Sequence, residues 1–486
     1  MQNFTYVDEN TSVKASLYAL IDNQATVASD FSGTAFPTTN LILSQTCFRT
    51  DEQKLYRLTA MGPDVWTLEA DLAAPMPLAA ANLPTQRPSL LMDFVNGPKR
   101  LQGKVNFSRA STATYYDATG KLVTAAANVP RFDHDPLTKI CRGLLIEEQR
   151  TNLCLRSEEF DNASWTKTNM TVVADAMVGP NGLLAADKLI PNTTNGTHGV
   201  GITSTSVTPG STYVWSIFGK AGEYKTMRLR AADSVGFIGD MLVDLDTGAM
   251  TIGGATAAVQ QLPDGWFRLT VAFAVNASAT SITHGIWVYD NAGNATFAGD
   301  GTSGLYAFGA GLELGAFPTS YIPTTTAQVT RAADVATIAA ADMFKSGYGT
   351  MCSEATQIGA SNTAPRVWQI RDTAGDILQH IVRGDTGQAY AESYVSAVYQ
   401  ASMVEPGIDP SQPVKSAFAW ASNDFALSIN GKATRTDTAG AIPALTTSTL
   451  YLGKDYGSSR YLNGHLRSLR YYPARLSNAE LQALTS

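Results

Sequence analysis

Residues 107–153 read FSRASTATYYDATGKLVTAAANVPRFDHDPLTKICRGLLIEEQRTNL. The sequence before this stretch is typical of a tether, and the sequence after it is typical of compact β domains. Two runs rich in β-forming residues, 111–116 and 121–126, flank the loop Asp117–Gly120. Aspartate opens that loop, and glycine closes it at a position where φ is often positive. The pattern predicts a β-hairpin.

A third strand is predicted near the end of the same stretch. Residues 143–146 are apolar and end on a β-branched residue, and they follow a turn-rich segment at 128–136. Residues 107–151 are therefore expected to form an extended β collar, with a tether before it and compact β domains after it.

The collar resembles a recurring module of tailed-bacteriophage fibre and appendage proteins. The strings that carry the resemblance are FSRAST, then AxNVPRFDxDP, then CRGLLIEEQRTNL. In that family the module precedes a carbohydrate-binding-module-like jelly roll and often a concanavalin-A/laminin-G-like domain. The resemblance implies a trimeric fibre on a virion surface, and it leaves open whether the fibre sits on the tail or the head.

The composition is typical of densely packed β structure. Charged residues are only 16% of the 486 residues, and small residues abound. A chain of this length is too long to fold around a single hydrophobic core, so we expect about two to four domains. The formal net charge is −7 and no block of Lys and Arg occurs, so nucleic acid is excluded as an expected partner.

The cysteines and the apolar runs exclude further classes. Cys47, Cys141, Cys154 and Cys352 lack CxxC spacing, so we expect neither a zinc site nor a disulfide framework, and most should be buried. No signal-peptide pattern opens the sequence, and no apolar run has the length of a membrane span. We expect a virion protein that is made in the host cytoplasm and does not insert into membranes.

Residues 1–75 are predicted to form a small β region that attaches to the virion. Short alternating runs at 41–43, 54–58 and 65–68 indicate a meander, in which a strand bearing Tyr pairs with one bearing Trp as in the N-terminal units of phage fibres. So small a unit needs a partner surface. Residues 76–106 are rich in Pro and Ala, which predicts a semi-rigid linker.

Residues 152–335 are predicted to form one antiparallel two-sheet sandwich. Strand patterns alternate with turns containing Gly and Asp, and no helix-period segment interrupts them. The expected strands are 212–220, 226–230, 241–244, 266–275, 282–289 and 304–314. The strings SEEFDNASW, PGSTYVWSIFGKAGEY and DGWFRLTVAF resemble the carbohydrate-binding-module-like jelly roll of phage fibres.

Residues 336–486 are predicted to form a second sandwich. The expected strands are 350–357, 366–371, 377–383, 388–394, 414–421, 425–429, 448–452 and 464–472. Ser477 and Glu480 make a capping box, which predicts a short C-terminal helix. The ending YLNGHLRSLRYYPARLSNAELQALTS resembles the terminal signature of concanavalin-A/laminin-G-like domains.

The predicted fold class is therefore all-β. A small N-terminal β attachment region and a collar are followed by two antiparallel β-sandwich (jelly-roll) domains.

The carboxylates give little support for an enzyme. A glycoside hydrolase needs two cooperating carboxylates, or a nucleophile with an oriented base. Glu147 and Glu148 are adjacent, so on a strand they would point to opposite faces. The cluster Asp133–Asp135 lies beside Arg131 and Arg142, so ion pairs within a loop are its ordinary explanation, with a metal or acid–base role as the alternative.

No cofactor is expected. Turn aspartates at 244, 246, 300 and 455 are candidate ligands for a structural calcium ion, although turns favour Asp without any ion. The five histidines are isolated from one another, which argues against a transition-metal site.

Aromatic residues are the candidate ligand platform, because sugars present apolar C–H faces that stack on rings. The candidate carbohydrate-binding residues are Trp287, Tyr289, Tyr390, Tyr394, Tyr399 and Tyr456. The first two share a face by the two-residue strand period, with core packing as the alternative for the tryptophan. The other four border polar turns.

Residues and resemblance together predict a non-enzymatic virion fibre that displays lectin-like domains for adhesion to host cell-surface saccharide. It would attach to phage tail or capsid proteins through its N-terminal region. The alternatives are a polysaccharide-degrading tailspike, disfavoured because no long β-helix repeats occur, and a capsid decoration fibre without specific glycan binding. We expect a homotrimer joined mainly through residues 1–150, because that part has apolar strands but no sandwich of its own to bury them.

Overall fold

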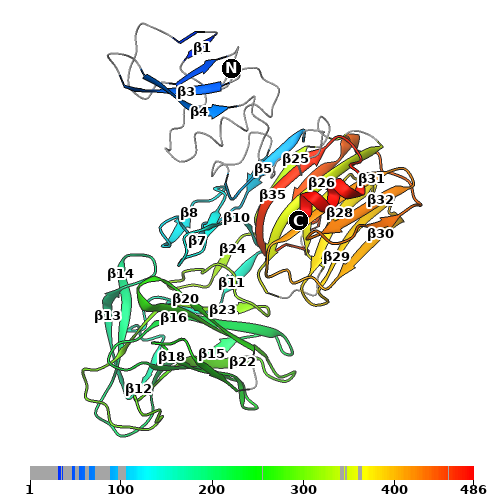
Figure 1. Ribbon diagram of the computed structural model, residues 1–486. Helices are drawn as coiled ribbons and strands as arrows, with labels where there is room; N and C mark the ends of the chain where they lie inside the picture. The colour runs from blue at the N-terminus through cyan, green and yellow to red at the C-terminus, as the bar shows by residue number, and fades with distance from the viewer. Residues whose placement is uncertain are drawn as a thin grey trace. The chain divides into compact units, whose positions relative to one another are not determined.

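A computed structural model describes residues 31–33, 35–36, 46–49, 54–60, 65–71, 88–96, 105–253, 256–339, 344, 347–359, 364–457 and 459–486. The chain divides into two compact units, Met1–Pro88 and Ser89–Ser486. The described elements are almost all β-strands in antiparallel sheets, which confirms the predicted fold class (Figure 1).

The first unit contains one four-stranded sheet. Its strands, in spatial order, are β1 (Phe31–Gly33), β2 (Thr46–Arg49), β3 (Lys54–Ala60) and β4 (Val65–Asp71). β3 carries Tyr56 and pairs antiparallel with β4, which carries Trp66, as predicted. The predicted run at 41–43 lies outside the described residues.

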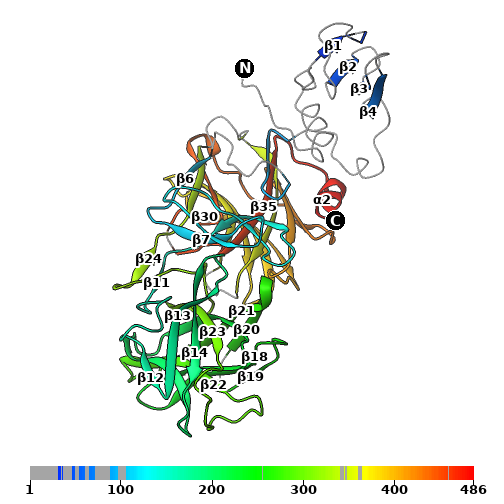
Figure 2. The same ribbon diagram turned by 90° about the vertical axis from the view of Figure 1, so that its left-hand side faces the viewer.

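The first sandwich consists of two six-stranded sheets, ordered β12-β15-β22-β17-β18-β19 and β13-β14-β23-β16-β21-β20 (Figure 2). Its strands are β12 (Thr166–Thr168), β13 (Met170–Val178), β14 (Leu184–Pro191), β15 (His198–Ser206), β16 (Thr212–Lys220), β17 (Thr226–Ala232), β18 (Phe237–Asp244), β19 (Met250–Ile252), β20 (Thr256–Gln261), β21 (Trp266–Ala274), β22 (Ser281–Tyr289) and β23 (Leu305–Leu314). All six predicted strands are present. Their inward residues, such as Trp215 and Ile286, are completely buried between the sheets.

The second sandwich has a seven-stranded sheet, ordered β30-β29-β28-β27-β34-β25-β6, against an eight-stranded one, ordered β33-β32-β31-β26-β35-β10-β9 with β5 also on β35. Its C-terminal strands are β25 (Val335–Ala339), β26 (Tyr348–Gln357), β27 (Arg366–Arg371), β28 (Ile377–Arg383), β29 (Gln388–Val395), β30 (Val398–Pro406), β31 (Val414–Ala421), β32 (Asp424–Ile429), β33 (Arg435–Asp437), β34 (Thr449–Leu452) and β35 (Gly464–Tyr472). All eight predicted strands are present, and β25, β30 and β33 were not predicted.

The second sandwich also takes in strands from before the first. These are β5 (Leu90–Asp93), β6 (Asn106–Ser108), β9 (Phe132–His134) and β10 (Cys141–Ile146). β10 confirms the predicted third collar strand, and it shares one edge of β35 with β5. β5 lies inside the segment that the sequence predicted as a linker, because its short apolar run was outweighed by the surrounding prolines.

The apolar collar residues are buried within the chain itself. Met92, Phe94, Leu144 and Ile146 belong to the same hydrophobic core as Trp368 of the second sandwich. The sequence argument for trimerisation assumed that strands before residue 150 lacked a sandwich to cover them. For the strands between residues 90 and 146 that premise is wrong.

The predicted collar hairpin is confirmed as β7 (Ala113–Tyr116) paired with β8 (Leu122–Ala125). Its Gly120 has φ +83°, and a Cβ there would lie 2.3 Å from the carbonyl oxygen of Pro136, so only glycine fits the turn. Tyr116 and Leu122 form a small core with Phe218 and Phe308. The hairpin therefore packs on the outer face of the β13–β20 sheet.

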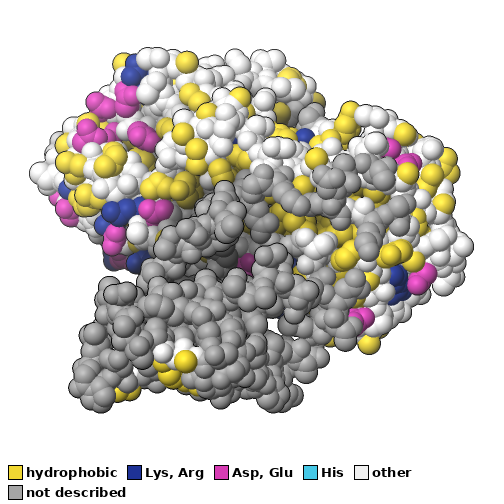
Figure 3. Space-filling model, turned by 90° about the horizontal axis from the view of Figure 1, so that it is seen from above, with side chains coloured by type: hydrophobic (Ala, Val, Ile, Leu, Met, Phe, Trp, Pro, Cys, Tyr) yellow, Lys and Arg dark blue, Asp and Glu magenta, His cyan; other side chains and the backbone are white. Residues whose placement is uncertain are grey.

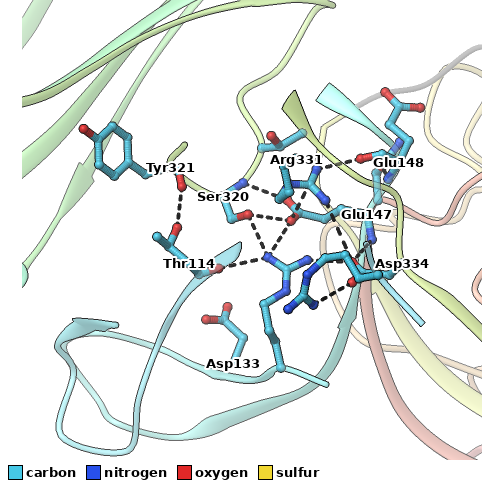
Figure 4. Close-up of polar contacts among 12 residues, drawn as sticks. Thr114, Asp133, Glu147, Glu148, Ser320, Tyr321, Arg331 and Asp334 are labelled. Carbon is cyan, nitrogen blue, oxygen red and sulfur yellow. Dashed lines mark hydrogen bonds and ion pairs between the residues drawn. The ribbon is translucent and has the colours of Figure 1, made fainter. Parts of the chain in front are cut away.

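A buried ion network joins the collar to the segment between the two sandwiches (Figure 4). Asp334 accepts from Arg109 at 3.0 Å and from Arg131 at 2.6 Å, and all three side chains are inaccessible to solvent. Arg131 also contacts Glu147 at 2.8 Å. Three sequence strings that the resemblance singled out, FSRAST, VPRFD and GLLIEE, therefore supply one intramolecular joint.

Glu147 is the second acceptor of this joint. Burial alone would raise the pKa of Glu147, but Arg331 and Arg131 hold it well below its usual range. Both of its carboxylate oxygens also accept from Ser320, through the amide at 2.8 Å and the hydroxyl at 2.7 Å. The carboxylate is thus fully engaged in structure.

The predicted C-terminal helix and the predicted burial of the cysteines are confirmed where the structure describes them. The helix α2 (Asn478–Thr485) begins after Ser477, whose side chain forms the capping box with Glu480. Cys141, Cys154 and Cys352 are buried free thiols. Among the described residues, no helix has the length and apolar character of a membrane span.

Candidate saccharide-binding faces

The six candidate aromatic residues lie on two faces, one in each sandwich. Trp287 and Tyr289 are on β22, Tyr390 and Tyr394 on β29, Tyr399 on β30, and Tyr456 in the loop between β34 and β35. We call the outer side of β15, β22, β17 and β18 the Trp287 face. The outer side of β30, β29, β28 and β27 is the Tyr394 face.

The strand period sets the Trp287 face. Along β22 the alternating residues Ile286 and Val288 are completely buried in the core, whereas Trp287 and Tyr289 are only partly buried. The predicted sharing of one face by these two aromatics is therefore confirmed, and the indole does not belong to the core.

Glycines lie on β15 and β22 next to the indole of Trp287. Gly199 pairs with Trp287, and Gly201 pairs with Gly285 on the neighbouring strand. A Cβ at Gly199 would lie 2.8 Å from the indole ring, and one at Gly285 would lie 2.7 Å from the Cα of Gly201. The missing side chains therefore let the indole lie close against the backbone of β15, and let β15 and β22 approach each other closely.

Arg230 lies between two rings of this face. Its guanidinium carbon is 3.9 Å from the centroid of Phe237 and 5.6 Å from that of Trp287. Burial lowers the pKa of Arg230. Phe237 is 66% exposed, so this aromatic edge is available to a ligand.

A second arginine fixes the neighbouring tyrosine. Arg228 donates to Asp240 at 2.6 Å and to the Tyr289 hydroxyl at 2.5 Å. The hydrogen bonds and charge of Asp240 raise the pKa of Arg228. The Trp287 face thus combines stacking surface with fixed hydrogen-bond donors.

A polar row crosses the Tyr394 face. The register places Gln369 beside Gln379 and Gln379 beside Glu392. Gln369 donates to the Gln379 side-chain oxygen at 2.7 Å, and Gln379 donates to Glu392 at 2.6 Å. The Tyr394 hydroxyl donates to the same Glu392 oxygen at 3.2 Å. Amide, carboxylate and phenol are therefore held in one connected row.

Tyrosines border this row on both sides. Tyr394 and Tyr399 meet edge to face with centroids 5.3 Å apart, and burial together with Glu392 raises the pKa of Tyr394 to about 12. On the other side, the Tyr456 amide donates to Gln369 at 2.7 Å, and its ring lies 4.7 Å from the guanidinium of Arg371. The hydroxyl of the remaining candidate, Tyr390, donates to Gln388.

The other candidate groups are used in structure. Asp133 accepts from the Tyr116 amide at 2.8 Å and pairs with His465 at 2.9 Å. Asp135 pairs with Arg142 at 2.7 Å, as the loop interpretation predicted. His134 contacts the carbonyl of Tyr116 at 3.3 Å. These contacts support the structural explanation of Asp133–Asp135.

The turn aspartates hold their own turns. Asp244 accepts from the amides of Asp246 and Thr247, and Asp300 accepts from the amides of Thr302 and Ser303. Within the part of the chain that is described, no group of three or more His, Cys, Asp or Glu residues could hold a metal ion. On the face shown in Figure 3, acidic and basic side chains lie in small mixed groups.

A small cavity lies between the collar hairpin and the segment that follows β23. Its volume is about 40 Å³, and Thr114, Tyr321 and Arg331 are among the residues that line it. That volume holds a few water molecules but no sugar ring. The two open faces are therefore better candidates for a saccharide than this cavity.

Sequence reasoning missed the polar residues of both faces. Glu392 lies between Tyr390 and Tyr394 at strand spacing, so the two-residue period could have placed it on their face. No local sequence pattern placed Arg230 or Arg366 on these faces. Arg230 contacts Trp287, and Arg366 contacts Gln379, on a neighbouring strand of the sheet.

The comparisons with known proteins match the second sandwich. Residues 353–482 match the family model described as the concanavalin A-like lectin/glucanases superfamily. This segment includes β27 to β30 and therefore the whole Tyr394 face. The search of curated proteins gave no match.

Solved structures give weak similarities. Domain 4 of a GH43 extracellular arabinanase from Geobacillus stearothermophilus, in complex with arabinotriose, is 13% identical over 35% of this chain and 82% of its own, with a TM-score of 0.26. Domains LG4–5 of the mouse laminin α1 chain are 12% identical over 59% and 88%, with a TM-score of 0.21. The CBM22-1–GH10 modules of a Clostridium thermocellum xylanase, complexed with xylohexaose, are 15% identical over 37% and 30%, with a TM-score of 0.21. Similarities this weak do not identify a ligand for this chain.

Proposed function

We propose that this chain is a virion fibre of a tailed bacteriophage, on the tail or the head, whose two sandwiches bind saccharides of the host cell surface. The fibre assignment rests on the resemblance of the collar strings. The saccharide proposal is carried by one observation, the partly exposed Trp287 on the outer side of β22 next to Arg230. The lectin-type family match at 353–482 supports it for the second sandwich.

The Trp287 face offers the two kinds of contact that a sugar needs. A pyranose can lay its C–H face on the partly exposed indole of Trp287. Arg228 and Arg230 can donate to its hydroxyls. Each hydroxyl contact exchanges one hydrogen bond with water for another, so a single site is expected to bind weakly.

Several copies would turn weak contacts into firm adhesion. In this proposal residues 1–88 join three chains and bind phage tail or capsid proteins, because one four-stranded sheet needs a further surface to cover it. Three pairs of sandwiches on one fibre would then raise the effective concentration of saccharide-binding sites at the cell surface. Light scattering of the full chain should give three times its 51.7 kDa mass, and a monomer would contradict the trimer.

The fibre is proposed to act by binding, without catalysis. The carboxylates considered as catalytic candidates are engaged elsewhere: Glu147 holds arginines of the joint, and Asp133 holds His465. A purified chain that shortens host polysaccharide would instead support the tailspike alternative.

Retention of host cells on beads that carry the full-length protein tests saccharide binding. Trp287→Ala should reduce retention because it removes the stacking surface, and a tenfold weaker site corresponds to about 1.4 kcal/mol. Tyr348→Ala is the matched control, since it removes a partly exposed ring at the start of β26, outside both faces. Equal retention by the Trp287 variant and the unmodified chain would refute the role of this face.

A further inference from the structure

Arg366 is a buried cation without an anionic partner. Only 3% of its surface is exposed, and no carboxylate lies within ion-pair distance of it in the described structure. Its Nε donates to the Gln379 side-chain oxygen at 2.9 Å and its Nη1 donates to the carbonyl of Ala364. The other buried arginines differ, since Arg109 and Arg131 each pair with Asp334.

Burying a guanidinium among neutral acceptors is costly, because the charge loses its hydration without gaining a counterion. Burial is also the main reason that the pKa of Arg366 falls to about 10. Its Nη2 makes no hydrogen bond with any described residue, so part of the guanidinium fork is free for an external acceptor. The structure therefore leaves one anionic acceptor missing here.

The charges near Arg366 leave its guanidinium without a direct partner. Arg460 lies near enough to lower its pKa, while Glu392 and Asp455 raise it. Glu392 accepts from Gln379, which in turn accepts from Arg366, so the carboxylate contacts the guanidinium only through an amide. A ligand that brings a negative charge would supply the direct contact.

The side chains around Arg366 have the chemistry of a sugar site. Tyr399 and Tyr456 are about half exposed, on opposite sides of the polar row. Glu392 and Tyr394 are partly exposed beside Gln379, so the row is open to solvent at β29. A ring lying on a tyrosine would bring its substituents to fixed amide and carboxylate groups.

We infer that the Tyr394 face binds an acidic saccharide, a sugar that carries a carboxylate, and that Arg366 is the residue that recognises this carboxylate. The free Nη2 can donate a charge-assisted hydrogen bond to a carboxylate, while the contacts of Nε and Nη1 hold the planar guanidinium in place, which suits an arginine rather than a lysine. Glu392 would accept from sugar hydroxyls, and Tyr394 or Tyr399 would supply the stacking surface. The inference rests on the proposed saccharide-binding function and names the ligand class of one of its two faces.

The test compares one polysaccharide in two charge states. Surface polysaccharide is extracted from host cells, and half of it is carboxyl-reduced, which converts acidic sugars into neutral ones of the same stereochemistry. Both forms are immobilised, and binding of the full-length protein is measured by interferometry. We expect reduction to weaken binding by about tenfold or more, as loss of a charge-assisted hydrogen bond implies.

Variants then locate the carboxylate contact. Arg366→Gln should bind the native polysaccharide as weakly as the unmodified chain binds the reduced form, and it should no longer respond to reduction. Arg366→Lys should be intermediate, because it keeps the charge but loses the fork. Arg383→Gln is the matched control: it removes a cation from the same sheet face that already pairs with Asp385, and it should behave as the unmodified chain.

The outcomes separate this inference from the proposed function. If the unmodified chain binds native and reduced polysaccharide equally, the acidic-sugar inference fails while saccharide binding stands. If reduction matters but Arg366→Gln and Arg366→Lys still respond to it as fully as the unmodified chain, the assignment to Arg366 is overturned. If neither form is bound, both proposals fail. Should Arg366→Gln melt earlier than the unmodified chain, the lysine variant provides the comparison.

Discussion

Asp334→Asn removes the central acceptor of the buried joint. Asp334 has no solvent-exposed surface, and it accepts from Arg109, from Arg131 and, at 2.9 Å, from the amide of Glu147. Asparagine keeps the size of the side chain but replaces one acceptor oxygen with a donor and removes the charge. Arg109, Arg131 and Arg331 would then face Glu147 as the only remaining carboxylate of the network.

The expected cost follows from the loss of one partner of a buried ion pair. Such a change destabilises a protein by roughly 3–5 kcal/mol, because a charge is left buried without compensation. With an m-value of about 2–3 kcal/mol per M, the urea midpoint should fall by about 1–2.5 M. Unfolding of the full-length chain is followed by tryptophan fluorescence, since Trp368 and Trp420 lie in the core of the second sandwich.

An exposed pair provides the control. Lys225 and Asp246 contact at 2.7 Å, and their side chains are 45% and 48% exposed. Asp246→Asn should leave the urea midpoint almost unchanged, because water screens the pair. If Asp334→Asn shifts the midpoint no more than this control does, the idea that the joint depends on its central charge is refuted.

Two further changes test other parts of the fold. Met92→Ala should destabilise the second sandwich by about 2–5 kcal/mol, because Met92 is 2% exposed within its core; an unchanged urea midpoint would restore the linker interpretation of this segment. His284→Gln should reduce acid sensitivity. Burial lowers the pKa of His284 to about 3 in the folded chain. Below about pH 6.5 the unfolded chain therefore binds a proton that the folded chain does not bind. The free energy of unfolding then falls by roughly 1.4 kcal/mol per pH unit until the pH reaches the folded pKa. The difference between urea midpoints at pH 7 and pH 4.5 should shrink in the variant, and an unchanged difference would contradict this origin.

Local patterns predicted those elements whose cause is local. The collar hairpin follows from Asp117 and Gly120, whose side chain and backbone freedom close a tight loop. The C-terminal helix follows from Ser477 and Glu480, which satisfy each other's backbone amides. Strands of both sandwiches followed from alternation, because a strand buried on one face must repeat every two residues.

Local sequence patterns could not predict the buried ion network of the joint or the strand β5. Leu90–Asp93 becomes a strand because it pairs with Ser468–Tyr471 at the far end of the chain, and no neighbouring residue signals that partner. Arg131 was expected to pair within its loop and Glu147 was considered only as part of a strand, whereas both contact Ser320, which lies after the first sandwich. Long-range pairing decides where these charges and edges are covered.

For the Trp287 face and the Tyr394 face, too, some features follow from the sequence and others only from the tertiary structure. The sequence by itself determined that Trp287 and Tyr289 share a face and that Tyr390, Glu392 and Tyr394 can share another, because side-chain direction alternates along any strand. Only the tertiary structure decided which side of each strand is the core and which is open. It also placed Arg230 beside the indole and left Arg366 buried without an anion, because strand register alone decides which side chains become neighbours across a sheet.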